Sequence, residues 1–242
     1  ATPEYCGGLK TQGSTFAPPS APEESHPVLN GLRVFAKDKS RFVLIGSIAI
    51  DGPENKILNR SFLIDNDGNI VSRYDKIHLF DINLSEQQSY CESATVRGGN
   101  DAVLCQTPFA KMGQTVCYDL RFPNLYRELS QSGAEVLFVP AAFTKKTGEA
   151  HWHVLNRARA IENGAFVVAP CAIGEVEGGG ASYGHSLIIN PWGEVLADGG
   201  VQVGVVSAVI DLDEVATARQ RIPSLSHDKP FTTKQSTGLV AK

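Results

Sequence analysis

Short β-branched segments alternate with helical patterns along this chain, and the alternation restricts the fold more than any other feature. Residues 135–139 and 166–169 are short and apolar, as buried strands are, and residues 149–163 between them predict a helix that ends near Asn163-Gly164. Strands separated by helices pair in parallel and are covered by those helices. We therefore predict an α/β fold, with helices outside a mixed sheet system.

Two hairpins should add antiparallel strands to this system. Residues 57–64 and 70–74 flank the turn Asn66-Asp67-Gly68, and residues 186–189 and 194–197 flank Asn190-Pro191-Trp192-Gly193. Turns of this composition are typical of hairpins. The remaining predicted elements are strands at 42–50, 112–117 and 205–210 and helices at 27–39, 123–132 and 212–221.

Two long segments lack a regular pattern. Residues 1–25 are rich in proline and glycine and predict an irregular loop, and residues 77–100 are weakly patterned and polar. A long loop inside a compact domain is more often functional than not. We expect one domain over 1–231, followed by a flexible tail at 232–242.

Composition restricts the class of partner. Of the 242 residues, Lys plus Arg number 22 and Asp plus Glu number 26, a net charge of −4. This balance argues against nucleic acid or an anionic membrane as partner. No apolar run reaches the roughly 20 residues that a spanning helix needs, and residues 1–10 do not have the pattern of a signal peptide.

Cysteine usage points to a reducing compartment. The five cysteines are an odd number with no Cys-x-x-Cys pair, which favours a cytoplasmic protein over a disulfide framework. Asn59-Arg60-Ser61 matches the N-glycosylation pattern, but short patterns recur by chance and nothing else points to secretion.

Cys117 stands where an apolar strand gives way to Tyr118-Asp119-Leu120-Arg121-Phe122-Pro123 and a helix. At such a turn, backbone N–H groups and a helix dipole can face a nucleophile and a developing oxyanion. A thiol also needs a nearby base or positive charge to act as a nucleophile. The alternative is an inert core cysteine, and the local context alone does not decide between them.

Three charged residues in other segments bear on that choice. Glu4 follows Pro3, Lys76 ends a predicted strand, and Glu92 lies in Cys91-Glu92-Ser93. A lysine at an apolar strand end is costly unless it is paired, so Lys76 is a candidate for a buried cation held by carboxylates. Taken singly, each of the three also suits a solvated surface.

In combination these segments resemble the nitrilase, or carbon–nitrogen hydrolase, superfamily over nearly the whole chain. The resemblance also covers the segments Ala150-His151-Trp152, Arg157-Ala158-Arg159-Ala160-Ile161-Glu162, Tyr183-Gly184-His185-Ser186 and Asn190-Pro191-Trp192-Gly193-Glu194. It implies a four-layer α-β-β-α sandwich. Only three residues precede Glu4, so the sequence is expected to lack the first strand-helix-strand of that fold.

The resemblance implies specific roles. Cys117 would attack an amide carbonyl, Glu4 would act as general base and then general acid, and Lys76 would stabilise the tetrahedral intermediate with the N–H of Tyr118. Glu92 would orient Lys76 and the substrate. Ammonia would leave, and water would hydrolyse the thioester without a metal or cofactor.

Within the superfamily, the residues after Cys117 resemble the small-amidase branch, which acts on carboxylate-bearing amides such as deaminated glutathione and 2-oxoglutaramate. A cation near the pocket is then expected, with Arg121 and Lys145 as candidates, and Phe143 is expected to contact substrate. For either cation, an ordinary surface ion pair is the alternative. The resemblance also implies a homodimer or higher homo-oligomer, for which the apolar helix around Trp152 is the predicted face.

Two other motifs suggest different chemistry. Gly180-Ala181-Ser182-Tyr183-Gly184 matches the nucleophile elbow of serine hydrolases, but it follows a glycine loop and leads into a predicted strand instead of a helix. His151 and His153 suggest a metal site, yet residues two apart on a helix do not share a face. We therefore expect no metal site there, and a non-catalytic protein that retains the scaffold is the remaining alternative.

Overall fold

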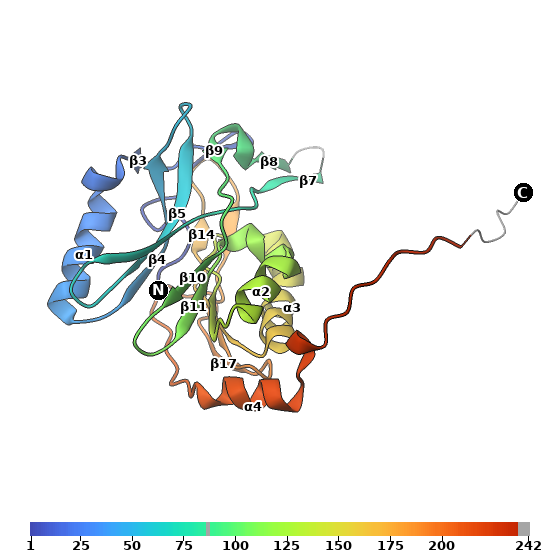
Figure 1. The fold of residues 1–242 in the computed structure, drawn as a ribbon. Helices are drawn as coiled ribbons and strands as arrows, with labels where there is room; N and C mark the ends of the chain where they lie inside the picture. Colours follow the sequence, from blue (N-terminus) through green and yellow to red (C-terminus); the bar gives the residue numbers. More distant parts are fainter. Residues whose placement is uncertain (86–87, 237–242) are drawn as a thin grey trace, which may run out of the picture.

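The computed structural model describes residues 1–85 and 88–236 and has two stacked β-sheets between helices (Figure 1). The first sheet has the order β3-β4-β5-β6, and β9 pairs with β5. Its strands are β3 (Ser20–Ala21), β4 (Val43–Asp51), β5 (Ile57–Ile64), β6 (Ile70–Asp75) and β9 (Val96–Arg97).

The second sheet has the order β10-β11-β12-β13-β16-β17, with β11, β12 and β13 parallel and antiparallel pairs on either side. The parallel centre and antiparallel edges confirm the mixed sheet. Its strands are β10 (Val103–Gln106), β11 (Lys111–Gln114), β12 (Val136–Phe138), β13 (Phe166–Ala169), β16 (Leu187–Ile189) and β17 (Val195–Asp198).

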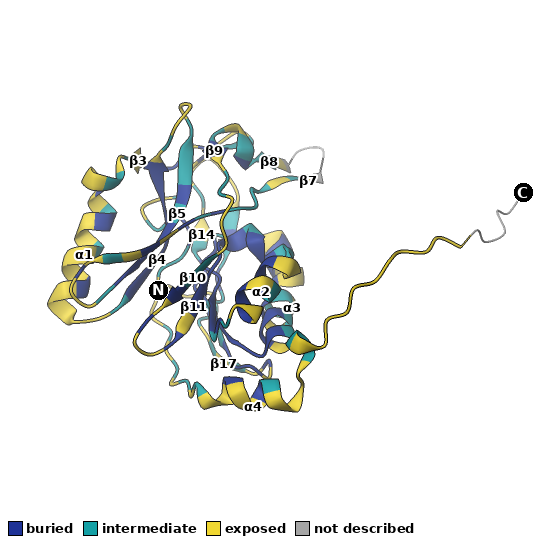
Figure 2. Cartoon of the chain, in the orientation of Figure 1, coloured by how far each residue is buried: buried dark blue, intermediate teal, exposed yellow. Residues whose placement is uncertain are grey.

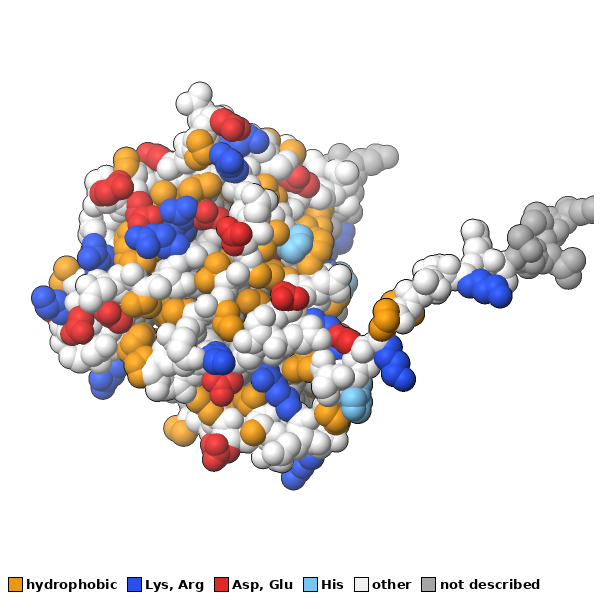
Figure 3. Space-filling model, viewed as in Figure 1, with side chains coloured by type: hydrophobic (Ala, Val, Ile, Leu, Met, Phe, Trp, Pro, Cys, Tyr) orange, Lys and Arg blue, Asp and Glu red, His pale blue; other side chains and the backbone are white. Residues whose placement is uncertain are grey.

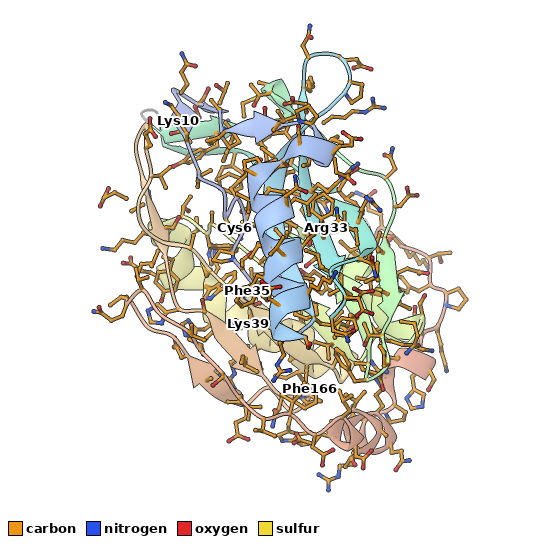
Figure 4. All side chains as sticks on the ribbon, turned by 90° about the vertical axis from the view of Figure 1, so that its left-hand side faces the viewer. Cys6, Lys10, Arg33, Phe35, Lys39 and Phe166 are labelled. Carbon is orange, nitrogen blue, oxygen red and sulfur yellow. The ribbon has the colours of Figure 1, made fainter. Side chains whose placement is uncertain are left out.

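Helices cover the outer faces of the two sheets. The helix α1 (Pro27–Lys39) lies on the first sheet, and Figure 4 views it face on, with Phe35 and Lys39 labelled along it. The helices α2 (Pro123–Gln131) and α3 (Lys145–Asn163) lie on the second sheet, and α4 (Asp213–Arg221) packs at one end. This is the predicted α-β-β-α arrangement.

Side-chain alternation along the strands builds the layers. On β4, Ile45 packs towards α1 while Leu44 enters the core between the sheets. On β12, Phe138 joins that central core, whereas Leu137 packs towards α2 and α3. Successive side chains of a strand point to opposite faces, so strands buried on both faces are apolar throughout, as Figure 2 shows.

Several sequence predictions are confirmed closely. The helices α1 and α2, the hairpin β5–β6 and the strand β13 lie where the patterns place them, within one or two residues, and α4 begins one residue later than predicted. The predicted helix 149–163 extends to Lys145, since its first turn lacks apolar periodicity but closes through the bond from Gly148 N–H to Thr144 O at 2.8 Å.

Other predictions were wrong. Residues 205–210 form no strand, and Val205 and Val209 are 97% and 98% exposed, because no neighbouring strand among the described residues supplies ladder hydrogen bonds. The strand predicted at 112–117 ends at Gln114, and a 3-10 helix starts at Cys117. The strands β10, β14 (Ile173–Glu175) and β15 (Ala181–Tyr183) are too short to give a clear pattern.

The two segments predicted as loops contain short elements. Residues 1–25 hold β1 (Thr11–Gln12), β2 (Thr15–Phe16), β3 and the 3-10 turn Glu23–Ser25. Residues 77–100 hold the hairpin of β7 (Asp81–Ser85) and β8 (Gln88–Cys91), the 3-10 turn Glu92–Ala94, and β9. These elements pair mainly with one another, so no amphipathic pattern announces them.

The surface and the C-terminal segment complete the fold. On the face in Figure 3, acidic and basic side chains are interspersed, without a field of one sign. After the 3-10 turn Ser224–Ser226, residues 229–236 run away from the domain without regular structure, and 237–242 of the predicted tail lie outside the described residues. No described helix has both the length and the apolar character needed to cross a membrane.

Candidate active site

Cys117 begins a strained turn behind the second sheet. Its φ of +49° lies in the left-handed region, which a residue with a side chain adopts only when its surroundings impose it. The Cys117 N–H donates to Pro140 O at 2.8 Å, and the Val116 N–H donates to the Asp119 carboxylate at 2.8 Å. These bonds hold the thiol at the start of the 3-10 helix Cys117–Arg121, buried but facing a pocket.

Glu4 arrives from the N-terminal segment, which runs beside β4. Thr2 N–H donates to Leu44 O and Cys6 N–H to Ser47 O, each at 3.0 Å. Gly46 permits this contact, because a Cβ there would lie 2.0 Å from Thr2 O. The Glu4 side chain is thereby directed inward from the first sheet.

Lys76 extends from the end of β6 into the same place and is only 2% exposed. Its Nζ lies 2.9 Å from Glu4 Oε1 and 2.8 Å from Glu92 Oε2. A buried ammonium is tolerated only with such partners, so the pairing that the sequence suggested for Lys76 is present.

Glu92 opens the 3-10 turn Glu92–Ala94 and is fully buried. Its Oε2 accepts hydrogen bonds from Lys76 Nζ and from the Phe80 N–H at 2.7 Å. Its Oε1 accepts from Tyr5 Oη at 3.2 Å and from Asn59 Nδ2 at 3.0 Å. Four donors therefore fix this carboxylate, and it in turn fixes the ammonium.

Glu4 is equally well held. Its Oε1 accepts from Lys76 and from Asn59 Nδ2 at 2.9 Å, and its Oε2 accepts from the Ala142 N–H at 2.9 Å. The Cys117 thiol also lies within hydrogen-bonding reach of this carboxylate. Because N–H and S–H donors already surround both carboxylates, the centre is built around an ammonium and not around a metal ion.

The electrostatics define the resting protonation state. Burial favours the neutral form of Glu4, but the adjacent Lys76 ammonium outweighs it and holds the pKa of that carboxyl below its usual value. Burial and the negative Glu4 raise the pKa of the Cys117 thiol well above its usual value, although Lys76 opposes this. The pKa of Lys76 is raised by the two carboxylates despite its burial. The centre therefore rests as carboxylate, ammonium and neutral thiol.

The pocket over these groups is narrow and largely apolar, with about 40 Å³ of room for the centres of water-sized molecules. Tyr118 and Phe143 line it, as predicted for substrate contacts. Its wall comes from four separate parts of the chain, and the other lining residues include Leu9, Phe16, Phe80, Tyr90, Thr144, Thr147 and Ser182.

The two predicted cations lie outside this wall. The Arg121 guanidinium carbon lies 5.2 Å from the centre of the Phe143 ring and 5.9 Å from that of Tyr118, and Arg121 Nη1 is 3.3 Å from His151 Nδ1. Lys145 is exposed and lines a hollow that shares Tyr90, Thr144 and Ala181 with the pocket. Of the two, Lys145 is thus nearer to the mouth.

Sequence reasoning missed Asn59, whose Nδ2 bridges Glu4 and Glu92 from the middle of β5. The match of Asn59 to the glycosylation pattern was interpreted as chance, and the complete burial of this side chain agrees with that. A polar residue in an otherwise apolar strand was the available signal, because such a group is buried only with partners.

Asp119 was also missed. This fully buried carboxylate accepts hydrogen bonds from Val116 N–H, Tyr74 Oη and His78 N–H, and it lies 2.7 Å from His78 Nδ1. Tyr74 and His78 flank Lys76 in the sequence. Asp119 therefore ties the turn that carries Cys117 to the segment that carries Lys76.

The two alternative motifs are not assembled as their patterns suggest. Ser182 lies in β15 and contributes to the pocket wall, without the strand-to-helix turn that a nucleophile elbow needs. His151 contacts Arg121 whereas His153 lies near Asp198, which confirms that the two histidines face different ways.

Comparison with known proteins places this geometry in a family. The profile of the carbon–nitrogen hydrolase family matches residues 5–220. A deaminated glutathione amidase of Dictyostelium discoideum is 42% identical over 207 residues, which cover 84% of this chain and 71% of that protein. Omega-amidase NIT2 of Homo sapiens is 35% identical over 211 residues, covering 87% and 76%.

Solved structures agree with the sequence comparison. The NitFhit protein of C. elegans has a TM-score of 0.80 at 35% identity, with 86% of this chain and 51% of that chain covered. Nit3 of Saccharomyces cerevisiae, a member of branch 10 of the nitrilase superfamily, has a TM-score of 0.75 at 29% identity, with 84% and 72% covered. The chain thus spans about half of NitFhit and about 70% of the other relatives. It belongs to the carbon–nitrogen hydrolase family, in the small-amidase branch of the nitrilase superfamily.

Proposed function

We propose that this chain is a cysteine-dependent amidase that hydrolyses the terminal amide of a small carboxylate-bearing substrate and releases ammonia, most like deaminated glutathione amidase. The observation that carries the proposal is the contact of Lys76 Nζ with Glu4 at 2.9 Å and with Glu92 at 2.8 Å beside the Cys117 thiol. Four residues from separate segments converge there, as catalysis by a thiol requires.

The first half of the reaction forms a thioester. Cys117 Sγ attacks the amide carbonyl carbon while the Glu4 carboxylate accepts the thiol proton. The Lys76 ammonium and the Tyr118 N–H stabilise the oxyanion of the tetrahedral intermediate. Glu4 then returns the proton to the leaving nitrogen, the C–N bond breaks, and ammonia departs.

The second half reverses these roles. Glu4 accepts a proton from water, the resulting hydroxide attacks the thioester carbonyl, and the same oxyanion donors act again. Collapse of this intermediate breaks the C–S bond, releases a carboxylic acid and restores the thiol with the proton from Glu4. Glu92 acts through Lys76, whose ammonium it holds in place.

A solved relative supports the role of the cysteine. In an amidase from Nesterenkonia sp. AN1, acrylamide adds at the active site cysteine, and that protein is 25% identical to this chain with a TM-score of 0.64. For the carboxylate of the substrate, Lys145 at the adjoining hollow is the proposed partner, while Arg121 supports Phe143 from behind.

The test is ammonia release from deaminated glutathione, 2-oxoglutaramate and 2-oxosuccinamate. We expect turnover to fall to background in Cys117→Ala, and to persist in Cys105→Ala, which removes another buried thiol away from the pocket. Retained turnover in Cys117→Ala would refute the mechanism. A preference for the oxo-acid amides would instead identify an omega-amidase, and turnover of nitriles alone would identify a nitrilase.

A non-catalytic scaffold protein is the alternative of another class. Alkylation distinguishes it, because the enzyme should react at Cys117 faster than at the other four cysteines. Uniform slow labelling together with no ammonia release would favour the scaffold.

We propose a reducing, cytoplasmic location, supported by the five free cysteines. We also propose a homodimer, but not through Trp152, which is fully buried and donates from Nε1 to His185 O at 2.7 Å. The exposed apolar side chains Val154, Ile161 and Trp192 on and beside α3 are a better face. Val154→Asp should then reduce the mass in analytical ultracentrifugation to that of a monomer, and an unchanged mass would exclude this face.

A further inference from the structure

Two imidazoles and one carboxylate converge at a point outside the pocket wall. His153 Nε2, from the middle of α3, lies 3.0 Å from Asp198 Oδ2. His185 Nδ1, from the segment before β16, lies 3.0 Å from Asp198 Oδ1 and 3.1 Å from Oδ2. One ligand atom from each of the three residues lies within 4.8 Å of the others.

The three side chains are held in place by bonds that do not involve one another. His185 has a φ of +55°, its N–H donates to Gly200 O at 2.7 Å, and its carbonyl accepts from Trp152 Nε1. The Gly200 N–H donates to Asp198 Oδ1 at 2.8 Å. The backbone strain at His185 is thus imposed by its neighbours, and strain of this kind gathers at ligand-binding positions.

The spacing of these atoms suits a divalent transition-metal ion. Zn²⁺ holds imidazole nitrogen and carboxylate oxygen at roughly 2.0–2.2 Å in a tetrahedron, which places ligand atoms about 3.3 Å apart. The observed N···O separations of 3.0–3.1 Å need to change by only a few tenths of an ångström. All three side chains are between a fifth and a third exposed, so a water molecule can reach a fourth position.

The donor set agrees with this geometry. Neutral imidazole and carboxylate are the ligands that Zn²⁺ accepts in sites with three protein ligands. Hydrogen bonds from His153, Gly200 and His185 outweigh the effect of partial burial and lower the pKa of Asp198, so this ligand is ionised at neutral pH.

We propose that His153, His185 and Asp198 form a binding site for Zn²⁺, separate from the Glu4–Lys76–Cys117 centre. The ion would join α3 to β17 and to the segment between β15 and β16. Tyr183 stacks on His185 with ring centres 4.6 Å apart and also packs against Gly148, in the first turns of α3 beside the pocket residue Thr147. Bound Zn²⁺ would therefore stabilise the wall of the pocket without entering it.

The experiment titrates ZnCl₂ into the untagged, metal-free protein by isothermal calorimetry. We expect one Zn²⁺ per chain and a rise in melting temperature with Zn²⁺ concentration. His153→Ala and His185→Ala should each weaken binding by more than the roughly 10- to 100-fold that loss of an outer-shell partner costs. His151→Ala is the matched control, since this histidine lies two residues away on the same helix but contacts Arg121, and it should leave the affinity unchanged.

Co²⁺ serves as a spectroscopic probe of the same site. Ligation by two imidazoles and a carboxylate should give visible d–d bands without a thiolate-to-cobalt charge-transfer band. The bands should persist in Cys117→Ala and disappear in Asp198→Asn, which keeps the size of the side chain. Melting curves of the metal-free variants show whether each is folded.

Three results would overturn the proposal. They are the absence of stoichiometric Zn²⁺ binding, binding that survives both His153→Ala and His185→Ala in folded protein, or binding lost only in Cys117→Ala. The last result would place the ion on the pocket thiol, and the amidase proposal would stand or fall separately by ammonia release.

Discussion

At the scale of single residues, the centre depends on one buried lysine between two buried glutamates. Lys76 and Glu92 are almost inaccessible, and every carboxylate oxygen of Glu4 and Glu92 has a donor. Removing one partner of such a group leaves an uncompensated charge, which costs more than the pair contributes. Conservative substitutions are therefore the informative ones.

Glu4→Gln should lower kcat by about 10²- to 10⁴-fold, because the amide keeps the size of the side chain but cannot accept the thiol proton. Steady-state ammonia release measures this, with Glu128→Gln on the exposed surface of α2 as the control. A kcat in Glu4→Gln within a factor of about ten of wild type would show that another group is the base.

At the scale of elements, the turn that carries Cys117 and the end of β6 form one unit through Asp119. We expect Asp119→Asn to remain folded but to lose roughly 1.5–3 kcal/mol of stability, because charged hydrogen bonds to buried donors become weaker. If Asp119 positions the thiol, kcat falls while KM stays near the wild-type value, and alkylation of Cys117 slows in parallel. Chemical unfolding and steady-state kinetics check both effects, and unchanged kcat in a destabilised variant would indicate a purely structural role.

Two helical glycines offer a matched comparison of packing. A Cβ at Gly148 in α3 would lie 2.3 Å from the Tyr183 ring, whereas a Cβ at Gly31 in α1 would meet nothing within 4 Å. Gly31→Ala should therefore stabilise the protein by about 0.4–1 kcal/mol, since it reduces the entropy of the unfolded chain. Gly148→Ala should lower the melting temperature and raise KM, because β15 must move and it lines the pocket.

Equal effects of the two alanine substitutions on melting temperature would contradict the close contact of α3 with β15. Differential scanning calorimetry makes the comparison, and ammonia release at several substrate concentrations separates the change in KM from a general loss of folded protein.

At the scale of the whole molecule, buried carboxylates link folding to pH. The pKa of Glu4 in the folded state lies below the usual 4.5, so its ionisation stabilises the fold above that pH, and this contribution is lost as the pH falls through the lowered value. The urea-unfolding free energy should therefore decline below pH 4.5. Glu4→Gln lacks the titrating group, so its decline should be shallower, and parallel curves for the two proteins would contradict the lowered pKa.

Local pattern predicted those parts of the fold whose partners are close in sequence. The helix at 27–39, the hairpin β5–β6 and the helix at 123–131 follow from side-chain period and turn residues, which act within a few residues. The segment 205–210 has the same strand-like composition, yet strand formation requires a neighbouring strand, and β-propensity alone does not supply one. The hairpin β7–β8 escaped prediction because it covers the site and not the core.

The sequence alone determined the chemical types available, namely the thiol at 117, the ammonium at 76 and the carboxylates at 4 and 92, and the resemblance carried by their segments indicated the family. Only the tertiary structure decided that Asn59 bridges both carboxylates, that Asp119 ties two of the segments together, that Trp152 lies in the core, and that His153 faces His185 instead of His151. The physical reason is range: propensity and turn chemistry act over a few residues, whereas a buried polar group is stabilised by whichever partners the packed layers bring to it, regardless of their separation along the chain.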